Sequence, residues 1–206
     1  MGQTTELLKR LFLEEWKALL LANFLFTAFS LPLLTVGPAL LAMNGVLTRR
    51  ADDRGNSSCW VDFWYVFKAK FWRGIQLEAV VGLYLLIILW SASVAGQLDG
   101  AGRTMLWLFI SLSLFLAAMT GVYLVPLLAD SSIPFFSALW DAALLSFARL
   151  PRTLLAMGAV YGSLCVFLLL YPISVLPWAM LLLAAAAALS VALVWPAINE
   201  LIFPQE

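Results

Sequence analysis

Polar side chains that could do chemistry are rare in the apolar part of this sequence, and several precede a break in its first apolar run. Asn23, Thr27 and Ser30 are spaced i, i+4 and i+7, so they share one face of a helix. Broken helices with polar faces form substrate sites or hinges in transporters. The same stripe can also hold helices together through hydrogen bonds, and we favour this structural interpretation.

Two prolines, Pro32 and Pro38, encode the break, because neither can donate a backbone hydrogen bond to the preceding turn. Gly37 adds backbone freedom directly before the second proline. In lipid the freed carbonyls need other donors. The hydroxyls of Ser30 and Thr35 are placed to supply them.

Glu78 is an acidic residue closely bounded by apolar sequence on its C-terminal side. A carboxylate within the membrane is a candidate proton or cation site. Arg73 is only five residues away, so we favour a position near the cytoplasmic interface, where Glu78 could pair with Arg73 or Arg152. Asn199 and Glu200 end the last apolar run and could lie near it.

Groups that most enzymes need are missing from the sequence. It has no His, no Cys cluster, no Gly-rich phosphate loop and no nucleophile elbow. Cys59 and Cys165 are expected to lie apart, so we predict neither a disulfide nor a metal site. The net charge of zero argues against nucleic acid as a partner. We therefore expect a protein that is not an enzyme and has no cofactor.

The elements that carry these residues follow from where charges are absent. Apolar residues make up 64% of the chain and charged residues only 12%, whereas soluble domains have about 25% charged residues. A helix needs about 20 apolar residues to cross a bilayer. The sequence predicts an all-α, polytopic membrane protein with one domain over 1–206. We expect an amphipathic segment at 1–17 and about five spans, at 18–43, 75–95, 104–128, 153–171 and 178–202.

Positive charges predict the topology. They concentrate in segments 49–73 and 149–152, which the positive-inside rule places in the cytoplasm together with the C-terminus. With the first run as one broken crossing, Lys9, Arg10 and Lys17 lie outside. A re-entrant hairpin would instead move them inside; we favour the single crossing because an internal repeat supports it.

The repeat emerges when the chain is shifted by 79 residues, which places Asp62 on Asp141. In each copy an acidic residue begins a short helix and basic residues end it, an order that suits the helix dipole. We predict interfacial helices at about 59–73, with an aromatic stripe, and 137–150. Their basic side chains are expected at headgroup level, where they could bind anionic lipid: Lys68, Lys70, Arg73, Arg149 and Arg152.

Similar phrases around Pro38, Pro126 and Pro196 suggest that spans one, three and five run in the same direction. The unit would then be a span, an interfacial helix and a span, present twice in parallel and followed by one further span. Such pseudosymmetry occurs in transporters, and it also occurs in proteins that transport nothing.

Small residues predict where two of the spans pack. Gly158 and Gly162 have GxxxG spacing, and Ala184 to Ala188 form a flat face on the fifth span. Small residues let helix backbones approach closely. We favour packing of the fourth span against the fifth, with a homo-oligomer as the alternative.

Tryptophan and tyrosine residues lie mainly at the ends of the predicted spans, as expected of an aromatic belt. A sugar-binding platform would need several of them on one outward cavity, and we favour the belt.

The sequence resembles the YesL-like family of bacterial membrane proteins, known as domain of unknown function 624. The resemblance lies in Asn23, in Ser-Leu-Pro-Leu-Leu-Thr-Val-Gly-Pro-Ala from Ser30, in Asp-Phe-Trp from Asp62, in Phe-Lys from Phe67 and in Tyr-Leu-Val-Pro-Leu-Leu-Ala from Tyr123. It implies a multi-pass protein of the bacterial cytoplasmic membrane, encoded near carbohydrate uptake genes. No residue roles are established for the family.

Two functions remain as expectations. The first is an accessory or scaffold protein whose partners are the lipid bilayer and another membrane protein, such as a carbohydrate transporter. The alternative is a small transporter or channel with its path at the broken first span, passing the polar stripe and Glu78.

Overall fold

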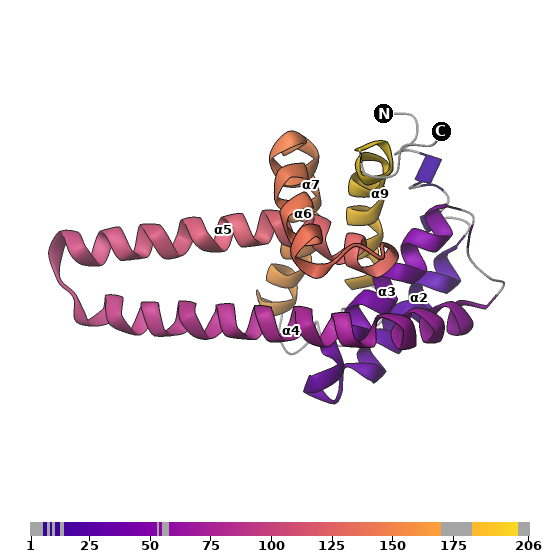
Figure 1. The fold of residues 1–206 in the computed structure, drawn as a ribbon, viewed down its shortest axis with the longest axis horizontal. Coiled ribbons are helices and arrows are strands. Elements are labelled where there is room, and N and C mark those ends of the chain that lie inside the picture. The colour runs from indigo at the N-terminus through magenta and orange to yellow at the C-terminus, as the bar shows by residue number, and fades with distance from the viewer. Residues whose placement is uncertain are drawn as a thin grey trace.

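The computed structural model describes residues 6–7, 9, 11–12, 15–52, 54, 58–169 and 183–201, and its elements there are all helical. The all-α class is therefore confirmed. The order along the chain is α2 (Trp16–Phe29), the 3₁₀ turn η2 (Leu33–Thr35), α3 (Val36–Ala51), α4 (Cys59–Gln97), α5 (Gly100–Asp130), α6 (Phe135–Ala148), α7 (Leu150–Leu169) and α9 (Leu183–Leu201) (Figure 1).

Two helices are long and apolar enough to cross a membrane, α4 and α5. A third candidate span exists if α6 and the first part of α7, which meet at a bend of 108°, count as one crossing. Trp16–Phe29 and Leu183–Ile198 are shorter apolar helices. Of the five predicted spans, the described residues thus contain two or three candidates.

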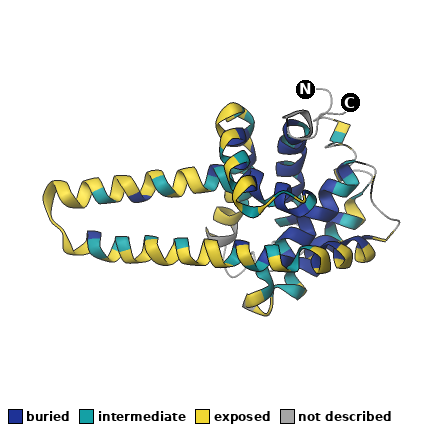
Figure 2. Ribbon diagram, in the orientation of Figure 1, coloured by how far each residue is buried: buried dark blue, intermediate teal, exposed yellow. Residues whose placement is uncertain are grey.

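The α4–α5 hairpin extends from a compact group formed by the other helices (Figure 1). Its two arms, 79–97 and 100–118, each contain a single buried residue, Ala95 and Ile110 (Figure 2). At 1.5 Å per residue each arm is about 28 Å long, close to the roughly 30 Å of bilayer hydrocarbon. We call the remaining described helical part, from which the arms project, the base.

The first apolar run folds back on itself. Glu15, directly before α2, forms an ion pair of 2.7 Å with Arg50, near the end of α3. The two helices therefore run in opposite directions, as a hairpin closed by the turn at 30–35. The prediction of a single broken crossing at 18–43 is wrong, because a crossing would separate these residues by the combined length of both helices. Of the two alternatives, the one in which the run folds back as a hairpin is the one that fits.

The predicted interfacial helix 59–73 is not separate, because it is continuous with the span at 75–95 in the 39-residue helix α4. In Figure 1 α4 is straight, so its first half cannot lie flat in the interface while the second half crosses. The second copy does bend, between α6 and α7. Pro151 occupies the first turn of α7, where its missing N–H is tolerated. The shift of 79 places Trp72 at that position in α4, and Trp72 does not interrupt a helix.

The core lies between α3 and α9. Residues 41–48 of α3 are all buried, and so are most residues of 184–198 in α9 (Figure 2). In Figure 1, α7 and α9 run across the direction of the hairpin, a departure from the parallel spans that the repeat predicted. The three prolines also differ in place: Pro38 begins α3, whereas Pro126 and Pro196 lie near the ends of α5 and α9.

Candidate functional site

The carboxylate of Glu78 lies at the start of α3. It accepts a hydrogen bond of 3.0 Å from the backbone N–H of Gly37. The first N–H groups of a helix lack partners within it, and a negative charge there is favourable. Glu78 therefore caps α3 from a different helix. The predicted partner Arg73 instead donates to the carbonyls of Ser131 and Ser132. The side chains of Asn199 and Glu200 lie outside the described residues.

Gly37 and Gly74 are in direct contact where α3 crosses α4. A Cβ atom on Gly37 would lie 2.2 Å from the carbonyl oxygen of Gly74, and one on Gly74 would lie 2.3 Å from the nitrogen of Pro38. Farther along, a Cβ on Gly45 would lie 2.7 Å from Val66. Gly37 and Pro38 were predicted to be special from the sequence, but Gly74 was not, because no pattern in the sequence distinguishes it.

Of the two hydroxyls expected to bind backbone carbonyls at the break, that of Thr35 does so. It donates to the carbonyl of Phe29 or to that of Pro32, the latter at 2.8 Å. The Oγ of Ser30 is buried and has no hydrogen-bond partner among the described residues. Thr27 donates to the carbonyl of Asn23 at 2.9 Å.

The predicted polar stripe of α2 faces the interior of the base. Asn23 is fully buried, and Ser30 lies half-buried where α2 ends. These side chains lie apart from the groove described next.

Phe29 anchors the turn against α4. Its ring lies 5.2 to 6.3 Å from four rings of the predicted aromatic stripe: Trp60, Phe63, Trp64 and Phe67. The outer side of α4 there bears a shallow groove, lined by Trp60, Val61, Trp64, Tyr65, Lys68 and Ala69. Three aromatic residues thus share one outward groove. Its lining is apolar apart from Lys68 and the Tyr65 hydroxyl, so it lacks the polar groups that would bind several sugar hydroxyls.

The cations Lys68 and Arg49 lie over aromatic rings beside this groove. The Lys68 Nζ is 4.9 Å from the centre of the Trp64 ring, and the Arg49 guanidinium is 4.6 Å from the centre of the Tyr65 ring. Lys68 is exposed and remains available at the surface, as predicted for an interfacial cation.

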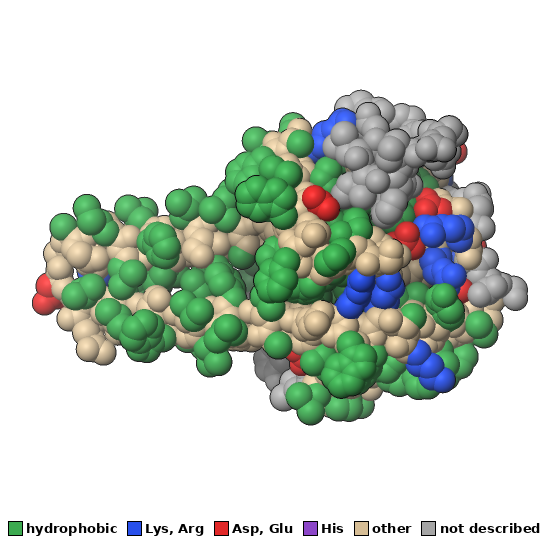
Figure 3. All heavy atoms as spheres, in the orientation of Figure 1, with side chains coloured by type: hydrophobic (Ala, Val, Ile, Leu, Met, Phe, Trp, Pro, Cys, Tyr) green, Lys and Arg blue, Asp and Glu red, His purple; other side chains and the backbone are tan. Residues whose placement is uncertain are grey.

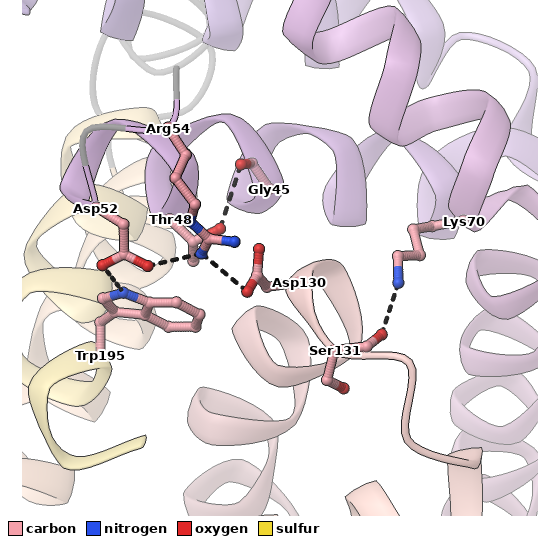
Figure 4. A network of polar contacts seen from close by, with 8 residues as sticks. All are labelled: Gly45, Thr48, Asp52, Arg54, Lys70, Asp130, Ser131 and Trp195. Atoms are coloured by element: carbon pink, nitrogen blue, oxygen red, sulfur yellow. Dashed lines mark hydrogen bonds and ion pairs between the residues drawn. The ribbon is translucent and has the colours of Figure 1, made fainter. Parts of the chain in front are cut away.

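Other predicted interfacial cations have internal partners. The Lys70 Nζ donates to the carbonyl of Ser131 at 2.6 Å (Figure 4). Arg73 donates to the same carbonyl at 2.7 Å. These carbonyls follow α5, where cations are favourable. Burial and the neighbouring Arg73 lower the pKa of Lys70, and Asp130 partly offsets them. In the second copy, Arg149 follows the last residue of α6, and its backbone carbonyl accepts the backbone N–H of Arg152 at 3.0 Å, a contact that involves neither charged side chain.

A charged network joins α3, α5 and α9 (Figure 4). Arg54 lies 2.6 Å from Asp52 and 3.0 Å from Asp130. The indole N–H of Trp195 donates to the other carboxylate oxygen of Asp52 at 2.6 Å. Burial alone would lower the pKa of Arg54, but the hydrogen bonds to Asp130 and Asp52 raise it. No sequence pattern indicated this network, because its members come from three separate helix ends.

Asp62 is fully buried and lies 3.7 Å from Arg49 and 3.8 Å from Arg50. Its negative charge suits the first turn of α4, as predicted. In the structure it also balances the positive charges of Arg49 and Arg50 at the end of α3. Nearby, the Cys59 thiol lies 3.5 Å from the carbonyl of Ala18. Burial raises the pKa of Cys59 to about 11.

The predicted packing of the fourth span on the fifth is found, since α7 contacts α9. Ala184 and Ala188 are fully buried. Gly158 and Gly162 do not form this contact, because a Cβ on either would meet nothing within 4 Å among the described residues. The alanine face was thus assigned correctly and the glycine face was not.

Residues 18–92 match a family described as "Protein of unknown function, DUF624". No curated protein and no solved structure matches the chain. The matched segment contains the α2–α3 hairpin, the Gly37–Gly74 contact, Glu78 and the aromatic residues around Phe29. Over residues 18–92 the chain is therefore similar to the DUF624 family of proteins of unknown function.

Proposed function

We propose that the protein is a non-enzymatic accessory or scaffold protein of the bacterial cytoplasmic membrane. The α4–α5 hairpin crosses the bilayer, and the base assembles at the cytoplasmic face, where it holds another membrane protein. The observation that carries the proposal is the bare hairpin, whose apolar arms match one bilayer in length and have almost no buried residue.

The charge distribution supports this orientation. Residues 79–97 contain no charge, the turn between the arms carries Asp99, and Arg103 lies at the start of the second arm. Figure 3 shows hydrophobic side chains along both arms, while Lys and Arg side chains gather over the base. Positively charged segments favour the cytoplasm. The C-terminal part of α9 belongs to the base through the Trp195–Asp52 hydrogen bond, which favours a cytoplasmic C-terminus.

Transport along the first apolar run has less support. Two of the side chains that would line the path are engaged locally, since Thr35 binds carbonyls of the turn and Glu78 caps α3. A role beside a carbohydrate transporter rests on the family resemblance alone.

Topology can be tested with cysteines in a Cys59→Ala, Cys165→Ala background. Gly102→Cys, at the start of α5 next to the hairpin turn, should react with a membrane-impermeant maleimide in intact cells, and Ser58→Cys at the base only after permeabilisation. Labelling of both from the same side would contradict a crossing hairpin.

The accessory role is tested by affinity capture from native membranes followed by reconstitution. A stoichiometric membrane protein should co-purify, and the isolated protein should leave proteoliposomes impermeable. Solute flux through the isolated protein, lost in Asn23→Leu, would instead establish transport.

A further inference from the structure

The turn between α2 and α3 presents apolar side chains outward. Leu31 is 81% exposed and Leu34 is 77% exposed, and Pro32 between them is also exposed. Leaving a leucine in water instead of burying it costs about 1.5–3 kcal/mol. No charged residue occurs in 18–48, so the turn and the adjoining parts of α2 and α3 carry no charge that would oppose an apolar environment.

Contacts on both sides hold this turn in place. Before it, the Phe29 ring packs among the aromatic rings of α4. Within it, Thr35 binds the carbonyl of Pro32. After it, Gly37 contacts Gly74 and is bound by Glu78. The two leucines therefore lie on a fixed protrusion and cannot fold back onto the base without breaking these contacts.

Along α4 the turn lies between two contacts, that of Phe29 with rings of residues 60–67 and that of Gly37 with Gly74 and Glu78. Gly37 lies against Gly74 and Glu78, immediately before the bare arm begins at residue 79. Trp72, on the adjoining stretch of α4, is 76% exposed. Exposed apolar groups of the turn and of α4 thus occur in the part of the base that adjoins the arms, with Trp72 on a different face of α4 from Gly74 and Glu78.

We infer that the turn at 30–34 is a second membrane contact, a re-entrant wedge that inserts into the lipid of the leaflet nearest the base. The occupant of this surface is the acyl region of the bilayer, because the turn is continuous with the lipid-facing arms. Trp72, which is exposed on another face of α4 in this part of the base, suits the interface, where tryptophan is enriched. The inference rests on the proposed crossing of the hairpin and adds a contact that the crossing does not require.

Spin labelling of the full chain in lipid nanodiscs tests the wedge. Nitroxides are attached singly at Leu31→Cys, Leu34→Cys, Leu86→Cys and Ser58→Cys in the Cys59→Ala, Cys165→Ala background. Collision with oxygen, which partitions into lipid, is compared with collision with a water-soluble nickel chelate. Leu86 is 65% exposed on the arm and Ser58 is exposed on the base, so they are the lipid and water references.

The expected result is an oxygen-to-nickel ratio at Leu31 and Leu34 several-fold above that at Ser58, with a depth shallower than at Leu86. A ratio equal to that of Ser58, with Leu86 still in lipid, overturns the wedge and leaves the proposed crossing standing. A low ratio at Leu86 overturns the crossing itself. Protection of Leu31 and Leu34 from both reagents would mean that protein covers the turn, and it also overturns the wedge. Both leucines are exposed, so labelling displaces no packed atoms.

Discussion

The carboxylate of Glu78 in α4 accepts the backbone N–H of Gly37 in α3, across 41 positions of the sequence. The bond lies beside the contact of Gly37 with Gly74. The start of α3 is therefore both packed against α4 and capped by it within one short stretch of α4. Glu78, whose sequence position made it a candidate proton site, thus has a structural role as the acceptor of the Gly37 N–H. The first turn of α3 depends on it, because Pro38 and the preceding break leave no local cap.

Replacing Glu78 with Ala should lower the free energy of unfolding by about 1–2 kcal/mol, the size of a lost helix cap. Glu78→Gln should lose less, because the amide oxygen still accepts the Gly37 N–H. Circular dichroism during denaturation in mixed dodecylmaltoside and dodecyl sulfate micelles measures both. If the Gln variant is as unstable as the Ala variant, a neutral oxygen acceptor is not enough to cap α3. If the Ala variant is as stable as the parent protein, Glu78 does not cap α3.

The Gly37–Gly74 contact predicts opposite effects for two similar substitutions in α4. Gly74→Ala places a methyl group 2.3 Å from Pro38 and should destabilise the protein by about 1–3 kcal/mol through overpacking. Gly82→Ala meets nothing within 4 Å and should stabilise α4 by about 0.5–1 kcal/mol through helix propensity. The same denaturation assay compares them. Equal effects of both substitutions would show that α3 and α4 do not meet at Gly74.

Composition predicted the helices better than their directions. The uncharged runs indicate long apolar helices, and α4 and α5 confirm this. Pro32 and Pro38 show that the first run breaks, but a break does not determine the direction of the next helix. That direction depends on the ion pair of Glu15 with Arg50, whose partners are 35 residues apart. Likewise, the repeat matched the charges of its two copies, while Trp72 in place of Pro151 left only one copy bent.

Several residues of the candidate site could be identified from the sequence, but the contacts between them could not. Gly37 and Glu78 were identified as unusual, but a single sequence carries no sign that they bind each other. Gly74 has no side chain and Asp130 looks like an ordinary helix end. Such contacts depend on the packing of α3, α4 and α5, which local patterns do not encode.

The buried carboxylate of Asp62 should be far more sensitive than its counterpart in the repeat. Asp62→Asn removes the counter-charge near Arg49 and Arg50, and breaking a buried pair in this way costs about 3–5 kcal/mol. Asp141→Asn changes a half-buried residue of α6 and should alter stability by less than about 0.5 kcal/mol. Denaturation of both variants checks this, and similar losses would mean that the two copies use their acidic residues alike.

Cys59 should resist alkylation at neutral pH. Burial raises the pKa of its thiol from 9.0 to about 11, so its thiolate fraction at pH 8 falls on the order of 100-fold, and the thiolate is the reactive form. The folded state favours the neutral thiol. The contribution of Cys59 to the free energy of unfolding is therefore complete below pH 9 and is lost as the pH rises towards 11. Mass spectrometry of iodoacetamide-treated Cys165→Ala protein measures the rate. Modification at pH 8 as fast as in denatured protein would contradict the buried position.

The α7–α9 contact predicts that alanine, not glycine, carries the packing. Ala188 is fully buried, so Ala188→Leu should overpack the core and destabilise the protein by about 1–3 kcal/mol. Gly158 faces no described atom within 4 Å, so Gly158→Leu should leave the free energy of unfolding unchanged or raise it slightly, because leucine is the better helix former. Denaturation measures stability, and mass photometry in detergent measures the oligomeric state. Should Gly158→Leu instead shift a dimer to a monomer while Ala188→Leu does not, the glycine face would pack between copies of the chain.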